Sequence, residues 1–374
     1  MPVRRSVLAG GAGALIMLSA ASSAALVSAP PAEADSAASA PFIVGGAFSG
    51  VAAISAISAW AVGYAGTAVK SKTLIARWTG KAWRRVPSPS PGTASALASV
   101  AVTSARDAWA VGTSGMYSSP KTLIAHWNGK AWTQVPSPSP GASSSLEGVA
   151  ATAAGSVWAV GVTMNSSGFL NPLVLRWNGR AWTLVRSPQA NSDLALHGVA
   201  ATSAGNAWTV GAYAPLGGRT AVLRWNGRGW GQVRSPSPTA YNALASVAAR
   251  SAHDAWAVGT AGLHNPKRTA TLVLHWNGRS WTQVRSPSPK AINALDGVAA
   301  TSAGNAWAVG SSGHKTLILR WNGTSWKQAP SPSPLGSNAL EGVAATSSGS
   351  AWAVGSSAGK TLILHWNGRG WHRE

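Results

Sequence analysis

The chain has 21 tryptophans in 374 residues, and their spacing divides it into seven copies of one unit. Each copy carries Trp-Ala-Val-Gly followed by Trp-Asn-Gly-x-x-Trp, or close variants, so three tryptophans per copy account for all 21. The first tryptophans are Trp60, Trp109, Trp158, Trp208, Trp256, Trp307 and Trp352, at intervals of 45 to 51 residues. A period of this length is typical of solenoids and propellers, in which each repeat buries its apolar face against the next.

Each copy reads as four short strands. In the second copy we expect strands at Ala108–Gly112, Thr122–Trp127 and Lys130–Val135, with Leu146–Thr152 joining from the start of the next copy. Most copies end in Pro-Ser-Pro-Ser-Pro or a close variant. Proline has no backbone N–H to donate, so this hinge ends the sheet and releases the chain to the next unit.

Four antiparallel strands repeated seven times, with no helical period, predict an all-β fold. The predicted fold class is a seven-bladed β-propeller of four-stranded antiparallel blades over residues 42–374, with an open β-solenoid as the alternative. We expect Phe42–Gly45 to pair near the seam as a closing strand. The repeats resemble kelch-type and BNR/Asp-box propeller repeats, in which a strand ending in glycine precedes an aromatic hairpin. The double glycine of kelch is reduced to one, as at Gly112, and the Asp-box motif is absent. The resemblance therefore implies the fold and no chemistry.

The Asn-Gly pair before the last strand, such as Asn128-Gly129, is the strongest short signal for a two-residue hairpin with a positive φ at both residues. Such a hairpin pairs Trp127 with Lys130 and His126 with Ala131. We expect the hairpin indoles to pack between neighbouring blades, with a tryptophan ladder that binds sugars or bases as the alternative.

The residue before the first hairpin tryptophan is basic in every copy. The seven residues are Arg77, His126, Arg176, Arg224, His275, Arg320 and His365. We expect each to lie flat against the neighbouring sheet in a cation–π contact.

Residues 1–34 are predicted to be a signal peptide. Arg4 and Arg5 precede an apolar stretch, and Ala32-Glu33-Ala34 fits an A-x-A cleavage site. A retained membrane anchor is the alternative, and the sequence leaves both twin-arginine and Sec export open. Residues 35–41 form a short linker. No later stretch of 18 apolar residues follows, so we expect a secreted, extracellular or cell-wall-associated protein without a membrane span after cleavage.

Cysteine is absent, which excludes disulfides, thiolate metal sites and thiol nucleophiles. No cofactor or metal motif is present, so none is predicted. Three acidic residues share one position in the inner strand, where they would line the central channel: Glu147, Asp296 and Glu341, with Ser49, Ala98, His197 and Ala245 in the other copies. They fit either acid–base chemistry or a solvated lining.

The copies differ most in the loops between the second and third strands. Function on a repeat scaffold is expected where copies differ, and aromatic and basic residues gather in and beside these loops. The predicted ligand-binding residues are Tyr64, Tyr117, Phe169, Tyr213, Tyr241, His264, Lys121 and Arg219. We expect them on one rim of the ring.

Lys and Arg number 30 against nine Asp and Glu, a formal net charge of +21. The chain is therefore interpreted as a secreted, monomeric binding or scaffold protein without catalytic activity. Its expected partner is a carbohydrate or anionic cell-envelope polymer, or another protein, and no specific nucleic acid. The alternative is an extracellular glycosidase or lyase on the same scaffold, which needs a carboxylate arrangement that the motifs do not display.

Overall fold

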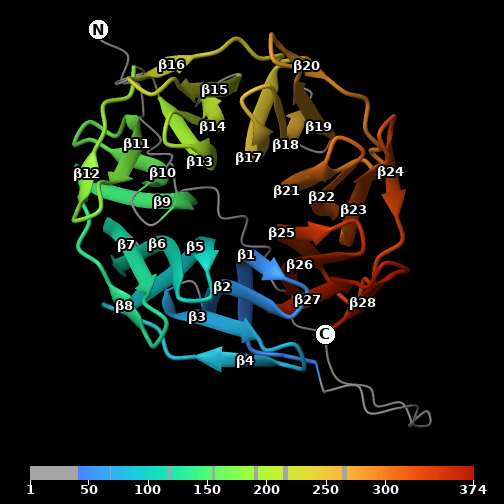
Figure 1. Ribbon diagram of the computed structural model, residues 1–374, viewed down its shortest axis with the longest axis horizontal. Helices are drawn as coiled ribbons and strands as arrows, with labels where there is room; N and C mark the ends of the chain where they lie inside the picture. Colours follow the sequence, from blue (N-terminus) through green and yellow to red (C-terminus); the bar gives the residue numbers. More distant parts are fainter. Residues whose placement is uncertain are drawn as a thin grey trace, which may run out of the picture.

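The protein forms a closed ring of seven four-stranded antiparallel sheets around a central channel, in a computed structural model (Figure 1). The structure describes residues 41–67, 69–116, 119–153, 156–188, 193–213, 218–262 and 268–374. Within these ranges all regular secondary structure is strand, as predicted. The predicted signal peptide and all but the last residue of the linker lie outside the described residues.

Each blade takes its four strands from consecutive stretches of chain. The inner strands are β1 (Gly46–Ser55), β5 (Ala94–Ser104), β9 (Ser143–Ala153), β13 (Leu194–Ser203), β17 (Tyr241–Ser251), β21 (Asn293–Ser302) and β25 (Asn338–Ser347). The second strands are β2 (Ser58–Thr67), β6 (Asp107–Met116), β10 (Ser156–Met164), β14 (Asn206–Tyr213), β18 (Asp254–Gly262), β22 (Asn305–Ser312) and β26 (Ser350–Ser357).

The third and outer strands complete the blades. The third strands are β3 (Lys70–Trp78), β7 (Ser119–Trp127), β11 (Leu170–Trp177), β15 (Thr220–Trp225), β19 (Thr269–Trp276), β23 (Lys315–Trp321) and β27 (Lys360–Trp366). The outer strands are β4 (Trp83–Val86), β8 (Trp132–Gln134), β12 (Trp182–Leu184), β16 (Trp230–Gln232), β20 (Trp281–Gln283), β24 (Trp326–Ala329) and β28 (Trp371–Arg373). Leu146–Thr152, which we assigned to the second unit, lies in β9 of the third blade. The unit therefore begins with its own inner strand.

The hairpin between the third and outer strands differs from the prediction. Trp127 pairs with Trp132, so the loop has four residues, and Trp127 does not pair with Lys130. Gly129 has a positive φ of 92°, whereas Asn128 acts through its side chain, whose Oδ1 accepts hydrogen bonds from the backbone N–H groups of Lys130 and Ala131. We predicted a positive φ at this asparagine. Its role is instead to accept hydrogen bonds from the backbone across the turn.

The hairpin tryptophans pack between blades, as expected. The ring centroid of Trp60 in the first blade lies 5.0 Å from that of Trp127 and 5.2 Å from that of Trp132, both in the second blade. The same contact recurs around the ring and closes it where Trp352 of the last blade meets Trp78 and Trp83 of the first, at 4.9 and 5.1 Å. At about 25 cal/mol per Å², burying each indole contributes roughly 4–6 kcal/mol as an upper estimate.

The basic residue before the hairpin covers this indole cluster, as predicted. The Arg224 guanidinium carbon lies 5.0 Å from the ring centroid of Trp208 in its own blade and 5.7 Å from that of Trp276 in the next. His126 takes the same place over Trp109, with ring centroids 4.2 Å apart. Where this residue is Arg224, its guanidinium contacts indoles of two blades through cation–π contacts, whereas the His126 ring lies against the indole of its own blade.

A β-bulge in each inner strand explains the glycine of Trp-Ala-Val-Gly. In the third blade Val160 pairs with Gly148 and Gly161 with Leu146, so Glu147 is the extra residue. A Cβ at Gly161 would lie 2.0 Å from the carbonyl oxygen of Ser145, and all seven equivalent glycines are equally crowded. The bulge therefore excludes any side chain at this position.

Gly161→Ala should destabilise the fold by about 3 kcal/mol or more, because the methyl group meets rigid backbone. Gly231→Ala is the matched control, since a Cβ there contacts nothing within 4 Å. Urea denaturation of both variants measures the difference, and equal stabilities would contradict this account of the repeat glycine.

The proline hinge is held by the threonine five residues before the last tryptophan of the third strand. In the second blade the Thr122 N–H donates to Ser139 Oγ at 3.2 Å, and Thr122 Oγ1 donates to the carbonyl oxygen of Pro138 at 3.1 Å. Four other blades repeat this arrangement, at Thr73, Thr220, Thr271 and Thr316. The third blade has Pro172 instead, which has no N–H to donate, and the sequence of its hinge departs from the others, with Arg-Ser-Pro-Gln-Ala at residues 186–190.

The segment before β1 occupies the hinge position of the seventh blade. The Thr361 N–H donates to the carbonyl oxygen of Val44 at 2.9 Å, and Thr361 Oγ1 donates to that of Phe42 at 3.0 Å. Gly45 forms an antiparallel bridge with Lys360. The predicted pairing at the seam is confirmed, but residues 42–45 form no regular strand, and they close the ring by occupying the hinge position.

A chain that begins at Gly46 loses these hydrogen bonds and the contact of Phe42 with Phe48. At about 1 kcal/mol per hydrogen bond, stability should fall by roughly 3 kcal/mol. Thermal unfolding compared with a chain that begins at Pro41 tests this. Equal melting temperatures would show that the segment does not hold the ring closed.

Candidate functional site

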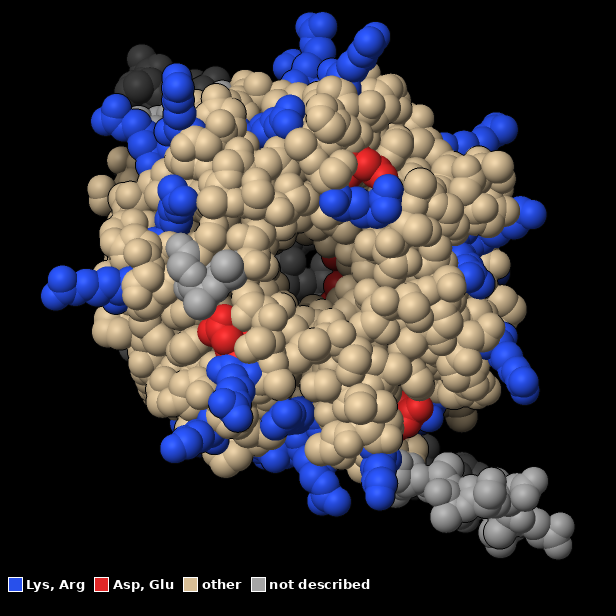
Figure 2. Space-filling model, in the orientation of Figure 1, with Lys and Arg blue, Asp and Glu red and all other residues tan. Residues whose placement is uncertain are grey.

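The narrow part of the central channel is lined by the seven bulge residues of the inner strands. They are Ser49, Ala98, Glu147, His197, Ala245, Asp296 and Glu341, around a cavity of about 140 Å³. Their position outside the regular pairing leaves these side chains free to differ between blades. Acidic atoms are visible inside the opening in Figure 2.

Asp296 and Glu341 lie in adjacent blades and have strongly perturbed acidities. Burial, and secondly the negative charge of Glu341, raise the pKa of Asp296 to about 7. Burial raises the pKa of Glu341 to about 7 against a hydrogen bond from Ser49, which favours the ionised form. Both carboxyls are partly open to the channel but are enclosed by its walls, so desolvation outweighs the hydrogen bond.

A histidine and a tyrosine belong to the same electrostatic neighbourhood. Burial lowers the pKa of His197, and the charge of nearby Glu147 opposes this effect. Burial raises the pKa of the Tyr64 hydroxyl, and the charge of Glu341 raises it further. Tyr64 was predicted as a loop-face residue, but it lies within β2, half-buried and within electrostatic reach of the channel.

A carboxyl with a pKa near 7 can both donate and accept a proton at neutral pH. The Asp296–Glu341 pair therefore has the acidity that general acid–base chemistry requires. Among the described residues, no group of three His, Asp or Glu side chains is arranged to hold a metal ion.

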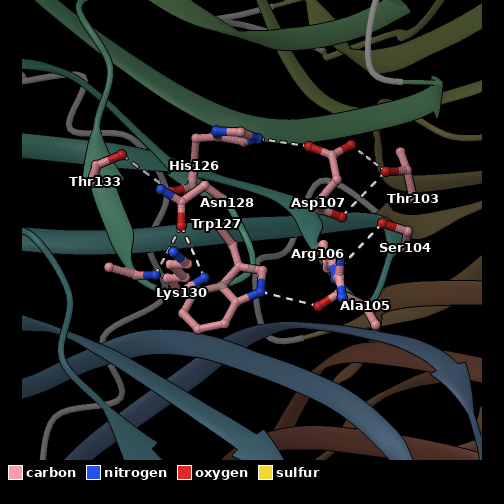
Figure 3. Close-up of polar contacts among 11 residues, drawn as sticks. Thr103, Ser104, Ala105, Arg106, Asp107, His126, Trp127, Asn128, Lys130 and Thr133 are labelled. Atoms are coloured by element: carbon pink, nitrogen blue, oxygen red, sulfur yellow. Dashed lines mark hydrogen bonds and ion pairs between the residues drawn. The ribbon is translucent and has the colours of Figure 1, made fainter.

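A second acidic motif begins the second strand in two blades (Figure 3). The Asp107 carboxylate accepts a hydrogen bond from His126 Nε2 at 2.6 Å and another from the Thr103 hydroxyl. In the fifth blade Asp254 contacts His275 Nε2 at 3.0 Å and Arg250 Nε at 2.7 Å. These pairs orient the imidazoles that cover the inter-blade indoles.

The repeat sequences contain a signal for these pairs that our predictions did not use. Where the hairpin residue is His126 or His275, the second strand begins with aspartate. Where the residue is Arg224 or Arg320, the second strand begins with asparagine, whose Oδ1 accepts from the arginine Nε at 3.2 and 3.3 Å.

The predicted loop-face residues that the structure describes lie at strand ends in five different blades. Tyr213 ends β14, and its hydroxyl accepts a hydrogen bond from Gln232 at 2.9 Å; its backbone N–H donates to the carbonyl oxygen of Arg219 at 3.0 Å. Burial raises the pKa of Tyr213 and the Arg219 charge opposes it. Tyr241 begins β17 and pairs with Gly262.

The other members of the set are more dispersed. Phe169 precedes β11 and is 54% exposed, and Lys121 Nζ donates to the carbonyl oxygen of Ala142 at 3.4 Å. Tyr117 and His264 lie outside the described residues. The structure brings Tyr213 and Arg219 together, and the other described members of the set lie in other blades, so ligand binding by this face stays a prediction.

The comparisons with known proteins support the fold and assign the chain to no family. No family model matches the chain, and no curated protein matches it. A solved structure of YCF48 bound to D1 peptide is 15% identical, with a TM-score of 0.55, and covers 86% of this chain and 92% of its own. YCF48 from Cyanidioschyzon merolae is also 15% identical, with a TM-score of 0.53 over 87% of this chain and 96% of its own.

An ulvan lyase of a polysaccharide lyase family, bound to -[GlcA(1-4)Rha3S]-, is 9% identical, with a TM-score of 0.56 over 88% of this chain and 96% of its own. At these identities the likeness shows the seven-bladed propeller repeat fold alone.

The prediction that the chain has no catalytic activity is overturned, because this fold also carries a polysaccharide lyase. The absence of familiar catalytic motifs was no ground for excluding an enzyme, since function depends on the site and not on the fold. Within the described ranges no helix has the length and apolarity needed to cross a bilayer.

The carboxyl pair predicts that stability decreases as the pH rises from about 4 to about 7. Unfolded Asp and Glu lose their protons near pH 4, whereas Asp296 and Glu341 keep theirs until about 7 in the folded protein. The folded state binds more protons in this window, so the free energy of unfolding decreases with rising pH.

The variant Asp296→Asn/Glu341→Gln should flatten this dependence in urea unfolding measured across that range. His197 has the opposite effect below about pH 6.5, because its lowered pKa makes acid destabilising. It is present in both proteins, so their difference isolates the carboxyls. An unchanged pH dependence would show that the pair titrates normally.

Proposed function

We propose that this protein binds an anionic polymer, of the acidic polysaccharide class, through the outer surface of its ring. The observation that carries the proposal is the separation of charge. Lysine and arginine side chains project around the circumference (Figure 2), and 30 such residues face only nine acidic ones in the sequence. A polyanion gains from each exposed cation that it contacts.

The described acidic residues offset few of these cations on the outer surface. Glu147, Asp296 and Glu341 line the channel. Asp107 and Asp254 pair with histidines, Asp254 also pairs with Arg250, and Glu374 lies 3.6 Å from His365. Asp193 accepts a hydrogen bond from the backbone of Leu170. The exposed surface therefore carries a largely uncompensated positive field.

The cellular context belongs to the same proposal. Residues 1–34 have the pattern of an export signal, and cell-envelope polymers are the polyanions that an exported, monomeric propeller would meet. Solved propellers of similar fold are bound to a peptide and to a saccharide, so the fold accommodates either kind of partner. We likewise propose that the repeats of this chain are related to kelch-type or BNR-type repeats.

The test is binding of the chain without residues 1–34 to polygalacturonate, with neutral dextran as the control. We expect binding to polygalacturonate alone, weakening between about 50 and about 300 mM NaCl because salt screens exposed charges. Binding to dextran with equal affinity, or no binding to polygalacturonate at low salt, would contradict the proposal.

Two matched variants locate the surface. Lys121→Ala/Arg219→Ala removes two cations from the predicted loop face of the second and fourth blades. Lys130→Ala/Arg228→Ala removes two from the hairpins of the same blades. If the loop face holds the polymer, the first variant should weaken binding at least about threefold more than the second at low salt, and the difference should shrink at high salt. Equal losses would show that the loop face has no special role.

A further inference from the structure

A cavity of about 270 Å³ lies on the outer side of the ring between the sixth and seventh blades. Its inner wall is apolar and is formed by Trp366 and Ala329, and Arg320, Lys327 and Arg369 surround it. Pockets that bury drug-sized ligands occupy roughly 300–1,000 Å³, so this one has room for a single small ring.

The cavity exists because two small residues face each other at this interface. The residue after the three-residue core of the outer strand is valine in the first five blades: Val86, Val135, Val185, Val233 and Val284. Each of these valines packs into an inter-blade hydrophobic cluster. In the sixth blade this residue is Ala329.

A hairpin residue of the next blade also lines the cavity. This residue is Gly370, and it stands where the second to sixth blades carry Ala131, Ala181, Gly229, Ser280 and Ser325 and the first carries Ala82. The interface between the sixth and seventh blades therefore combines alanine with glycine. Protein interiors are normally filled to high density, so an opening where the first five blades carry a packed valine indicates an occupant.

The lining defines the chemistry of that occupant. The Arg320 guanidinium is fixed in place, because its Nε donates to Asn305 Oδ1 at 3.3 Å and its Cζ lies 4.9 and 5.3 Å from the ring centroids of Trp307 and Trp366. A fixed guanidinium suits a carboxylate or sulfate, which it can bind through two parallel hydrogen bonds. Lys327 and Arg369 add two more exposed cations at the edge.

The remaining lining suits a hydroxylated ring. Asn322 and Gln328 line the cavity beside the cations. The Asn322 Oδ1 accepts hydrogen bonds from the N–H groups of Thr324 and Ser325, so its NH2 group and the Gln328 amide are the groups that can bond to hydroxyls. The indole of Trp366, with Ala329 and Pro330, offers an apolar surface for the carbon face of a sugar. We propose that this cavity binds one anionic pyranose, a uronate or a sulfated sugar, between the sixth and seventh blades.

This inference goes beyond the proposed function, since it assigns one sugar unit to one small cavity and its test uses monosaccharides. Glucuronate, glucose 6-sulfate, glucose and acetate are titrated into the chain without residues 1–34, and the indole N–H signals are followed by NMR. We expect the signals of the cavity indoles, Trp366 above all, to shift. A single sugar in a small cavity should bind with a dissociation constant on the order of 1 mM.

Glucuronate or glucose 6-sulfate should bind at least about tenfold more tightly than glucose and acetate, and the tighter of the two identifies the anion. Equal binding of glucose would show that the cations do not contribute. Equal binding of acetate would show a general anion site without sugar recognition. Either result, or no shift of any indole signal, overturns the proposal.

The decisive variant is Ala329→Val, which restores the residue of the other blades and fills the cavity. It should retain or increase stability and reduce sugar affinity at least about tenfold. Val284→Ala is the matched control, because it alters the neighbouring interface and should leave affinity unchanged. Arg369→Gln should weaken binding of the anionic sugars alone. Sugar binding by Ala329→Val with wild-type affinity would overturn the proposal.

These outcomes are distinguishable from those for the polymer. If the Ala329→Val variant loses the sugar and still binds polygalacturonate, the cavity is separate from the surface that binds the polymer. A wild-type chain that binds glucuronate but no polymer supports the cavity and contradicts the proposed function.

Discussion

The ring depends on the contact between one tryptophan in each blade and two tryptophans in the next. The centroid distances around the ring are nearly constant, from 4.9 to 5.3 Å, and the last blade meets the first through the same contact. Around this contact the blades pack aliphatic residues, such as Val62, Ile75 and Leu97 in the cluster that holds Trp60, all buried. Closure is thus a property of the repeated indole cluster, and the hinge-like segment at Val44 completes the seam.

The same constraint determines where the chain is free to vary. Residues that touch the indoles repeat from blade to blade, whereas bulge residues such as Glu147 and His197 line the channel. Their variation therefore does not disturb the packing. At Ala329 the reverse holds, because the change falls within a position that packs in the other blades. A residue that differs from the other blades at a packing position is therefore stronger evidence of a function than one that differs at a channel position.

Much of the fold could be predicted from the sequence, because tryptophan spacing reports directly on blade number and on the inter-blade contact. The predicted hairpin pairing was wrong because Asn-Gly fits both a two-residue and a four-residue loop. Only the pairing with the outer strand shows that Trp127 faces Trp132. The bulges were not predicted, because an extra residue in one strand can be recognised only when the pairing with the neighbouring strand is known. For the site, the shared position of Asp296 and Glu341 was found, but their acidity depends on burial in three dimensions. The exclusion of catalysis was wrong because it rested on missing motifs.

The charge distribution separates the channel from the outer surface. The cations favour ionised carboxylates in the channel, yet the pKa values of Asp296 and Glu341 are raised to about 7. Local desolvation therefore outweighs the long-range field, which salt screens over about 8–10 Å. A polyanion bound at the circumference would be sensed only weakly by the carboxyl pair, because most of its charge lies beyond that distance. The two regions can accordingly be changed independently, and chemistry at the channel would depend on what enters the channel itself.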